Sequence, residues 1–154
     1  LNLEEKTAII LGSGGVVPSI IYALKKMNTK KIIVSNRTKK KAEELKNIFN
    51  DIEILDWGKL TNFDIIINAT SLGLKEDDKF GIDFSQAGGN KLYYDVIYEP
   101  FKTEFSSEAL KHENMYENGL QMFLHQAQKA FKIWHNIEPN IDDNLINFMK
   151  SKSL

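Results

Sequence analysis

A glycine-rich segment near the start of the chain has the composition of a phosphate-binding turn. It comprises Gly12, Ser13, Gly14, Gly15 and Val16. An apolar run at 7–11 precedes it and helical spacing follows it, which predicts a strand, a turn and a helix. In such a turn, backbone N–H groups approach a pyrophosphate at the positive end of the helix dipole. Because Val17 replaces the third glycine of the usual pattern, a tight turn without a ligand and a methyltransferase loop remain alternatives.

The residues after the second apolar run, 31–35, could select the nucleotide. Asn36, Arg37, Thr38 and Lys41 occupy the place where a dinucleotide-binding fold meets the adenosine ribose. No acidic residue stands there to hold a 2′-hydroxyl group, whereas Arg37 can bind a 2′-phosphate through two parallel hydrogen bonds. Arg37 is also the one arginine among 20 basic residues. The pattern favours NADP(H) over NAD(H), with a solvated basic surface as the alternative.

Polar residues also follow two later predicted strands. Asn68, Thr70 and Ser71 come after the first of these strands, and Tyr98 comes after the second. Ligands of open α/β sheets bind outside the carboxyl ends of the strands, so we predict that these side chains contact a ligand. The alternatives are an ordinary Asx or Ser/Thr turn for the first group and a half-buried rim aromatic for Tyr98. We interpret Asp95 as a structural residue that caps nearby backbone N–H groups.

A long helix predicted over 119–136 carries a further candidate group. At about 100° per residue, Gly119, Met122 and Gln126 lie on one line that faces a possible cleft. Core packing is the alternative for Met122, and solvent exposure is the alternative for Gln126. An apolar stripe lies beside this line and contains Leu120, Phe123, Leu124, Ala127, Ala130, Phe131 and Trp134.

The composition is that of one soluble domain. The chain has 154 residues, of which 42% are hydrophobic and 27% are charged. A net charge of −1 gives no electrostatic case for binding nucleic acid or an acidic membrane surface, and no apolar run reaches membrane-spanning length. The absence of cysteine excludes disulfides, thiol catalysis and Cys-ligated metals. We therefore predict a cytoplasmic protein without a metal site.

Alternating strand and helix patterns predict an α/β fold, namely a Rossmann-like, doubly wound parallel sheet with helices on both faces and additional C-terminal helices. Strands are expected at 7–11, 31–35, 52–55, 64–68, 92–96 and 115–116. Helices are expected at 16–27, 39–49, 103–112, 119–136 and 141–150. We interpret 1–154 as a single NADP-binding domain, within which 140–154 is a C-terminal helix that packs against a further substrate domain.

Five motifs, in order and spread over about residues 6–139, resemble the cofactor-binding domain of the shikimate dehydrogenase family. They are Gly12-Ser13-Gly14-Gly15, Asn36-Arg37-Thr38 with Lys41, Asn68-Ala69-Thr70-Ser71-Leu72-Gly73, Tyr94-Asp95-Val96-Ile97-Tyr98-Glu99-Pro100 with Thr103, and Asn118-Gly119-Leu120-Gln121-Met122-Phe123 with Gln126-Ala127. Each motif alone is a weak signal, but the set at consistent spacing is specific.

The resemblance implies an NADP-dependent oxidoreductase that reversibly reduces 3-dehydroshikimate to shikimate, on the route to chorismate and the aromatic amino acids. The implied cofactor contacts add Leu72, Val96, Gly119 and Met122. The implied substrate contacts are Tyr98 and Gln126. Family members carry the Lys–Asp pair for proton transfer in an earlier substrate domain. We therefore assign no catalytic residue to this chain, and we expect it to bind NADP(H) without oxidising shikimate.

The last predicted helix should present an apolar side without a partner. Its positions Ile141, Leu145, Phe148 and Met149 follow helical spacing, which predicts exposed apolar surface and self-association, for instance as a homodimer.

Three other functions remain open on the sequence. A quinate dehydrogenase would look the same in this half of the enzyme. A stand-alone NADP(H) sensor or regulatory module would use the same loop, although it would have no use for Tyr98 and Gln126. A methyltransferase predicts an acidic residue at the end of the second strand, where Asn36 and Arg37 stand.

Overall fold

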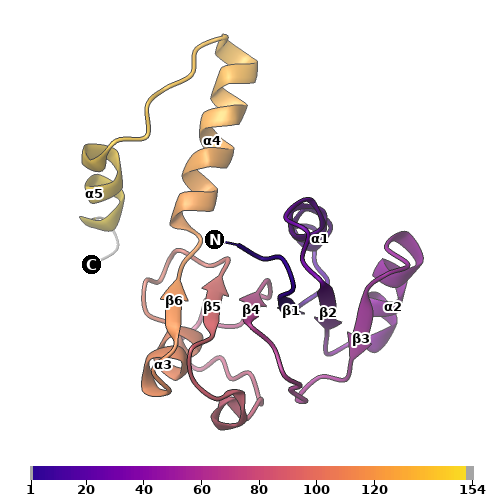
Figure 1. Ribbon diagram of the computed structural model, residues 1–154. Helices are drawn as coiled ribbons and strands as arrows, with labels where there is room; N and C mark the ends of the chain where they lie inside the picture. Colours follow the sequence, from indigo (N-terminus) through magenta and orange to yellow (C-terminus); the bar gives the residue numbers. More distant parts are fainter. Residues whose placement is uncertain (1, 152–154) are drawn as a thin grey trace.

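A six-stranded parallel sheet forms the centre of the computed structural model, which describes residues 2–151 (Figure 1). The strands are β1 (Thr7–Leu11), β2 (Lys31–Ser35), β3 (Glu53–Leu55), β4 (Ile65–Asn68), β5 (Leu92–Asp95) and β6 (Met115–Glu117). Their order is β3-β2-β1-β4-β5-β6, and all neighbours pair in parallel. The chain therefore winds outward in both directions from β1 and β4, and ligands of such sheets bind where the direction reverses.

Helices cover both faces of the sheet. They are α1 (Val17–Lys26), α2 (Lys39–Ile48), α3 (Glu104–Lys111), α4 (Leu120–His135) and α5 (Asp143–Ser151), with a 3₁₀ turn η1 (Phe84–Ala87). The helices α1 and α2 pack on one face, and α3 and η1 pack on the other. The predicted doubly wound, Rossmann-like fold is confirmed, with bounds that differ from the expected ones by one or two residues.

Two cores result because successive side chains of a buried strand point to opposite faces. On one face, Ile10 and Val34 join Val17 and Ile21 in an aliphatic core. On the other face lies an aromatic core, whose fully buried members include Phe63, Phe80, Tyr93 and Phe105. The ring centroids of Tyr93 and Phe105 are 5.0 Å apart. Of the expected ligand contacts, Leu72 is buried in the aromatic core, and Val16 and Val96 pack against the aliphatic core.

The helix α4 begins at the sheet and then projects away from it (Figure 1). Leu120 and Leu124 are buried at its start, whereas Phe131 and Trp134 in its last turns are 41% and 75% exposed. The residues of the predicted apolar stripe therefore follow helical spacing, but only those in the first half of α4 are packed. No element within residues 2–151 covers the second half. The helix ends at His135, and Asn136 follows in the left-handed conformation.

No residue of α5 is buried, but of the four apolar positions predicted to be exposed only Phe148 is so, whereas Ile141, Leu145 and Met149 are half-buried. Phe148 is 57% exposed. Asp142, which precedes α5, accepts a hydrogen bond from the backbone N–H of Leu145 at 2.9 Å, as an N-cap does. The end of the predicted 140–154 segment, 152–154, lies outside the described residues.

Candidate functional site

The carboxyl edge of the sheet holds two cavities, one on each side of the glycine loop. A cavity of about 210 Å³ lies on the β2 side, and one of about 730 Å³ lies on the β5 side. Predicted site residues that line the smaller cavity are Gly12, Ser13, Gly14, Asn36, Arg37, Thr70, Ser71 and Leu72. Those that line the larger cavity are Gly15, Val16, Val96, Tyr98, Gly119, Met122 and Gln126. The structure thus brings fifteen of the eighteen predicted residues to the two cavities, and the loop borders both.

The glycine loop owes its path to Gly12. This residue has φ +111°, and a Cβ atom on it would lie 2.7 Å from the carbonyl oxygen of Ala69. Gly14 and Gly15 differ, because a Cβ atom on either would meet nothing within 4 Å. Their lack of side chains leaves open space above the loop, which is the form that a phosphate cradle requires.

The same loop offers unused hydrogen-bond donors at the start of α1. Within residues 2–151, the backbone N–H groups from Ser13 to Val16 have no acceptor, and the first turn of α1 contains no acidic side chain. The N–H group of Gly12 is already bound to the carbonyl oxygen of Ser35 at 2.7 Å. Free N–H groups at a helix N-terminus bind anions, so the loop has both the shape and the polarity for phosphate groups.

Arg37 is the charged residue in the lining of the smaller cavity. Its guanidinium group has no hydrogen bond or ion pair within the described part of the chain, whereas Lys39 is paired with Asp56 at 2.8 Å. The side-chain amide of Asn36 donates to the carbonyl oxygen of Thr38 at 2.9 Å and thereby fixes the turn into α2. An exposed and unpaired guanidinium is free to bind a phosphate group bidentately.

Three predicted contacts do not line either cavity. Thr38 is the N-cap of α2 and Lys41 lies in its first turn, and both are exposed. Their contact with a ligand stays a prediction. Asn68 is the third and has no exposed surface.

Asn68 holds the loop that follows β4. Its amide nitrogen donates to the carbonyl oxygen of Leu72 at 3.0 Å and to the Oδ1 atom of Asp95 at 2.9 Å. Its Oδ1 atom accepts from the backbone N–H and the hydroxyl group of Thr70, at 3.0 and 2.7 Å. With every polar atom engaged, the Asn68 side chain positions Thr70 and Leu72 and has no accessible surface. Its direct contact with a ligand stays a prediction.

Asp95 joins that loop to the next one. Its carboxylate also accepts from the backbone N–H of Ile97 and from the hydroxyl group of Thr103, each at 3.0 Å. Burial raises the pKa of Asp95 to about 6, and the hydrogen bonds from Ile97, Thr103 and Asn68 oppose that rise. The interpretation of Asp95 as a structural cap is confirmed by these contacts, and the cap reaches across three segments.

The larger cavity is built where α4 meets the end of β5. A Cβ atom on Gly119 would lie 2.0 Å from the carbonyl oxygen of Val96, so only glycine permits this approach. Met122 and Gln126 line the cavity from the same side of α4, as the predicted line of residues requires. The ring of Tyr98 stacks on that of Phe123, with centroids 4.6 Å apart and planes inclined by 22°. The Tyr98 hydroxyl is thus carried on a fixed ring at the cavity wall.

Four residues that line these cavities are absent from the predicted contacts. Trp57 and Ala69 line the smaller cavity, and Ser19 and Phe123 line the larger one. Ala69 and Phe123 belong to the motifs of the family resemblance, but no ligand contact is expected of them there. Trp57 follows β3 at the same edge of the sheet, and its position after a predicted strand was the available signal.

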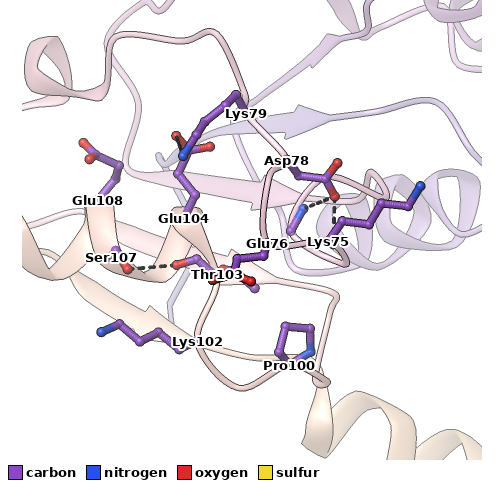
Figure 2. A pocket seen from close by; sticks show the side chains of 11 residues that line it. Lys75, Glu76, Asp78, Lys79, Pro100, Lys102, Thr103, Glu104, Ser107 and Glu108 are labelled. Carbon is purple, nitrogen blue, oxygen red and sulfur yellow. Dashed lines mark hydrogen bonds and ion pairs between the residues drawn. The ribbon is translucent and has the colours of Figure 1, made fainter.

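A third cavity, of about 670 Å³, lies beside the start of α3 and contains none of the predicted site residues (Figure 2). Its charged side chains have both signs, and Lys79 is 3.6 Å from Glu104. Two backbone hydrogen bonds, from Lys75 and Gly73, lower the pKa of Asp78. The N-terminus of α3 is capped within the chain, because the hydroxyl oxygen of Thr103 accepts from the backbone N–H of Ser106 at 3.1 Å.

Two further classes of site can be checked in the described residues. Between residues 2 and 151, no group of three or more His, Cys, Asp or Glu side chains is arranged to hold a metal ion. Over the same residues, no helix is long and apolar enough to cross a membrane.

Comparison with known families and proteins gives one consistent result. The family described as shikimate / quinate 5-dehydrogenase matches residues 1–74, and the shikimate 5′-dehydrogenase C-terminal domain matches residues 119–143. The first match contains the glycine loop, Arg37 and Thr70, and the second contains Gly119, Met122 and Gln126. The matched segments therefore contain the whole lining of the smaller cavity and all of the lining of the larger one except Val96 and Tyr98.

Curated relatives and solved structures agree with these matches. The chain is 52% identical over 148 residues to shikimate dehydrogenase (NADP(+)) of Pelagibacter ubique, covering 96% of this chain and 56% of the relative. It is 40% identical to the enzyme of the same name from Caldicellulosiruptor saccharolyticus, covering 97% and 57%. A shikimate dehydrogenase solved in complex with NADP+ matches with a TM-score of 0.83 and 30% identity, over 98% of this chain and 56% of that one.

The shikimate dehydrogenase of Aquifex aeolicus matches with a TM-score of 0.78 and 31% identity, over 90% of this chain and 52% of that one. The chain spans about half the length of the curated relatives it matches. The chain belongs to the shikimate / quinate 5-dehydrogenase family, and it corresponds to about half of the length of these relatives.

Proposed function

We propose that the chain is the NADP(H)-binding part of an enzyme that reversibly reduces 3-dehydroshikimate to shikimate. The observation that carries this proposal is the glycine loop, which borders a cavity with an unpaired arginine on one side and a cavity with Tyr98 and Gln126 on the other. A dinucleotide whose pyrophosphate lies on the loop can extend into both. The names of the relatives support the cofactor and the substrate.

Each cavity suits one half of the cofactor. The unbound N–H groups between Ser13 and Val16 would hold the pyrophosphate, and Arg37 would hold the 2′-phosphate. Gly119 and Met122 would border the nicotinamide. When bound, NADPH supplies the hydride that reduces the substrate carbonyl.

The residues of this chain contribute binding and orientation to that reaction. Tyr98 and Gln126 line the cavity on the nicotinamide side and would face the substrate. We assign no proton donor to the chain, and we expect the 154-residue chain alone to bind NADP(H) without turning over shikimate. Substrate-side residues within the same cavity favour an enzyme over a stand-alone NADP(H) sensor.

We also propose that α4 and α5 pack against the part of the enzyme that completes the substrate site, and that the enzyme works in the cytoplasm. The exposed apolar residues from Phe131 onward, Trp134 and Phe148 among them, support the first proposal. Self-association of the isolated chain would follow from the same surface.

Titration calorimetry of the chain with NADPH and with NADH tests the proposed function. We expect NADPH to bind more tightly, and Arg37→Ala to erase the difference, because a charged bidentate contact contributes about 1.5–3 kcal/mol. Arg37→Lys is the matched control: it keeps the charge but not the paired donors, so an intermediate preference is expected. Equal affinities of the unmodified chain for the two nucleotides would contradict the proposal.

A further inference from the structure

Trp57 is a fixed aromatic residue at the β3 end of the site. Its ring is half-buried and packs on the aromatic core, and its Nε1–H group donates to the carbonyl oxygen of Phe80 at 3.1 Å. A tryptophan ring with its N–H group bound and one side packed has little freedom left to rotate. The part of Trp57 that remains accessible is therefore presented in one orientation.

Trp57 lines the smaller cavity together with Arg37 and the glycine loop. The strand order places β3 beyond β2, on the side of the sheet away from β5. If the pyrophosphate lies on the glycine loop and the 2′-phosphate at Arg37, the base attached to the same ribose lies at this end of the cavity. The hydrogen bond to Phe80 and the contact with the aromatic core explain how Trp57 is held in place. They do not explain why a large aromatic residue lines the cavity that contains Arg37.

We propose that Trp57 is the wall on which the adenine ring of the bound nucleotide stacks, with the Arg37 guanidinium bordering the same space. This inference rests on the proposed function and deepens it by assigning the adenine end of the site. A flat heteroaromatic base stacks favourably on a fixed indole ring, and a guanidinium plane can also stack on it. Trp57 would act as a binding residue for the nucleotide and take no part in hydride transfer.

The chain contains two tryptophans, which makes the proposal measurable by fluorescence. Trp134, the second one, is 75% exposed in the distal part of α4 and lines neither cavity. Trp134→Phe therefore leaves Trp57 as the single tryptophan, and Trp57→Phe leaves only Trp134 as the control. Adenosine 2′,5′-bisphosphate, which contains only the adenine end of NADP, should quench the emission of Trp57 in Trp134→Phe. Nicotinamide mononucleotide should not quench it, and neither compound should quench Trp134 in Trp57→Phe.

Calorimetry supplies a second readout that is independent of fluorescence. Trp57→Leu should weaken the binding of adenosine 2′,5′-bisphosphate about 10-fold, whereas Trp57→Phe should keep it within about threefold, because phenylalanine retains an aromatic face.

If NADPH does not bind the unmodified chain at all, the proposed function and this inference are both refuted. If NADPH binds while the Trp57 emission stays constant at saturating adenosine 2′,5′-bisphosphate, only the adenine wall is refuted. Because the quenching experiment retains Trp57, it decides the matter even if Trp57→Leu does not fold.

Discussion

The sheet and the C-terminal arm, defined as residues 131–151, use similar apolar residues in opposite ways. In the sheet layers Phe105 is fully buried, whereas in the arm Ile133 and Trp134 are 80% and 75% exposed. Both regions have amphipathic helices, so spacing alone does not separate them. The difference lies in how much of the apolar side is covered: it is buried in the sheet layers, whereas Ile133 and Trp134 of the arm remain mostly exposed. The sheet is thus packed on both faces, and the exposed apolar surface of the arm supports the proposal that the arm packs against another part of the enzyme.

Replacing a phenylalanine by alanine in each region should give the largest difference in the free energy of unfolding. Phe105 contacts the rings of Phe80, Phe84 and Tyr93, with centroids 5.0–5.7 Å apart. Phe105→Ala should lower the free energy of unfolding by about 4 kcal/mol, because it removes contacts and leaves a cavity. Phe131→Ala, the matched change in the arm, should cost less than about 1 kcal/mol. Urea unfolding followed by circular dichroism measures both, and equal losses would mean that the arm is packed in solution.

The free energy of unfolding should depend on pH in opposite directions through one carboxyl group in the sheet and one in the arm. Burial raises the pKa of Asp95 from 3.8 to about 6, so its folded form binds a proton more readily than its unfolded form. Stability from this group is full below about pH 4 and is lost as the pH rises through about 6, a change of about 3 kcal/mol. The free energy of unfolding of the unmodified chain, relative to Asp95→Asn, should therefore fall across that interval.

Glu138 in the arm provides the control for this titration. Hydrogen bonds from Lys129 and Lys132 lower its pKa from 4.5 to about 2, so its contribution is lost as the pH falls through that range. The effect should be small and should shrink with added salt, because all three side chains are exposed to solvent. Guanidinium chloride would mask that salt effect, so unfolding is best followed in urea. An unchanged pH slope in Asp95→Asn would remove burial as the cause of the Asp95 shift.

Local patterns were sufficient to predict the strands, most of the helices and most of the site. The glycine loop, Arg37 and Thr70 all lie within a few residues of a strand end, so chain order alone brings them to one edge. The line through Gly119 and Met122 depends only on helical periodicity.

What sequence reasoning missed depends on contacts between distant segments. The side chain of Asn68 is turned inward by Asp95, 27 residues later in the chain. Trp57 reaches its place through Phe80, 23 residues away. In α4 the change from buried to exposed apolar residues falls between Leu124 and Phe131. Its position depends on where the sheet ends and not on the residue types of the helix. Each of these follows from tertiary geometry that periodicity does not contain.

The smallest expected effect concerns the arm in solution. Its most exposed apolar side chains, Ile133, Trp134 and Ile137, are 60–80% accessible, and burying them against a second copy of the chain would be favourable. We expect the mass measured by sedimentation equilibrium to rise with protein concentration, and the double variant Trp134→Ser, Ile137→Ser to reduce that rise. Leu110→Ser is the matched control, because Leu110 is 66% exposed on α3 and should not affect association. If Leu110→Ser reduced the association as much as the arm variant does, the surface of the sheet layers would also mediate association. The two regions would then not differ in this property.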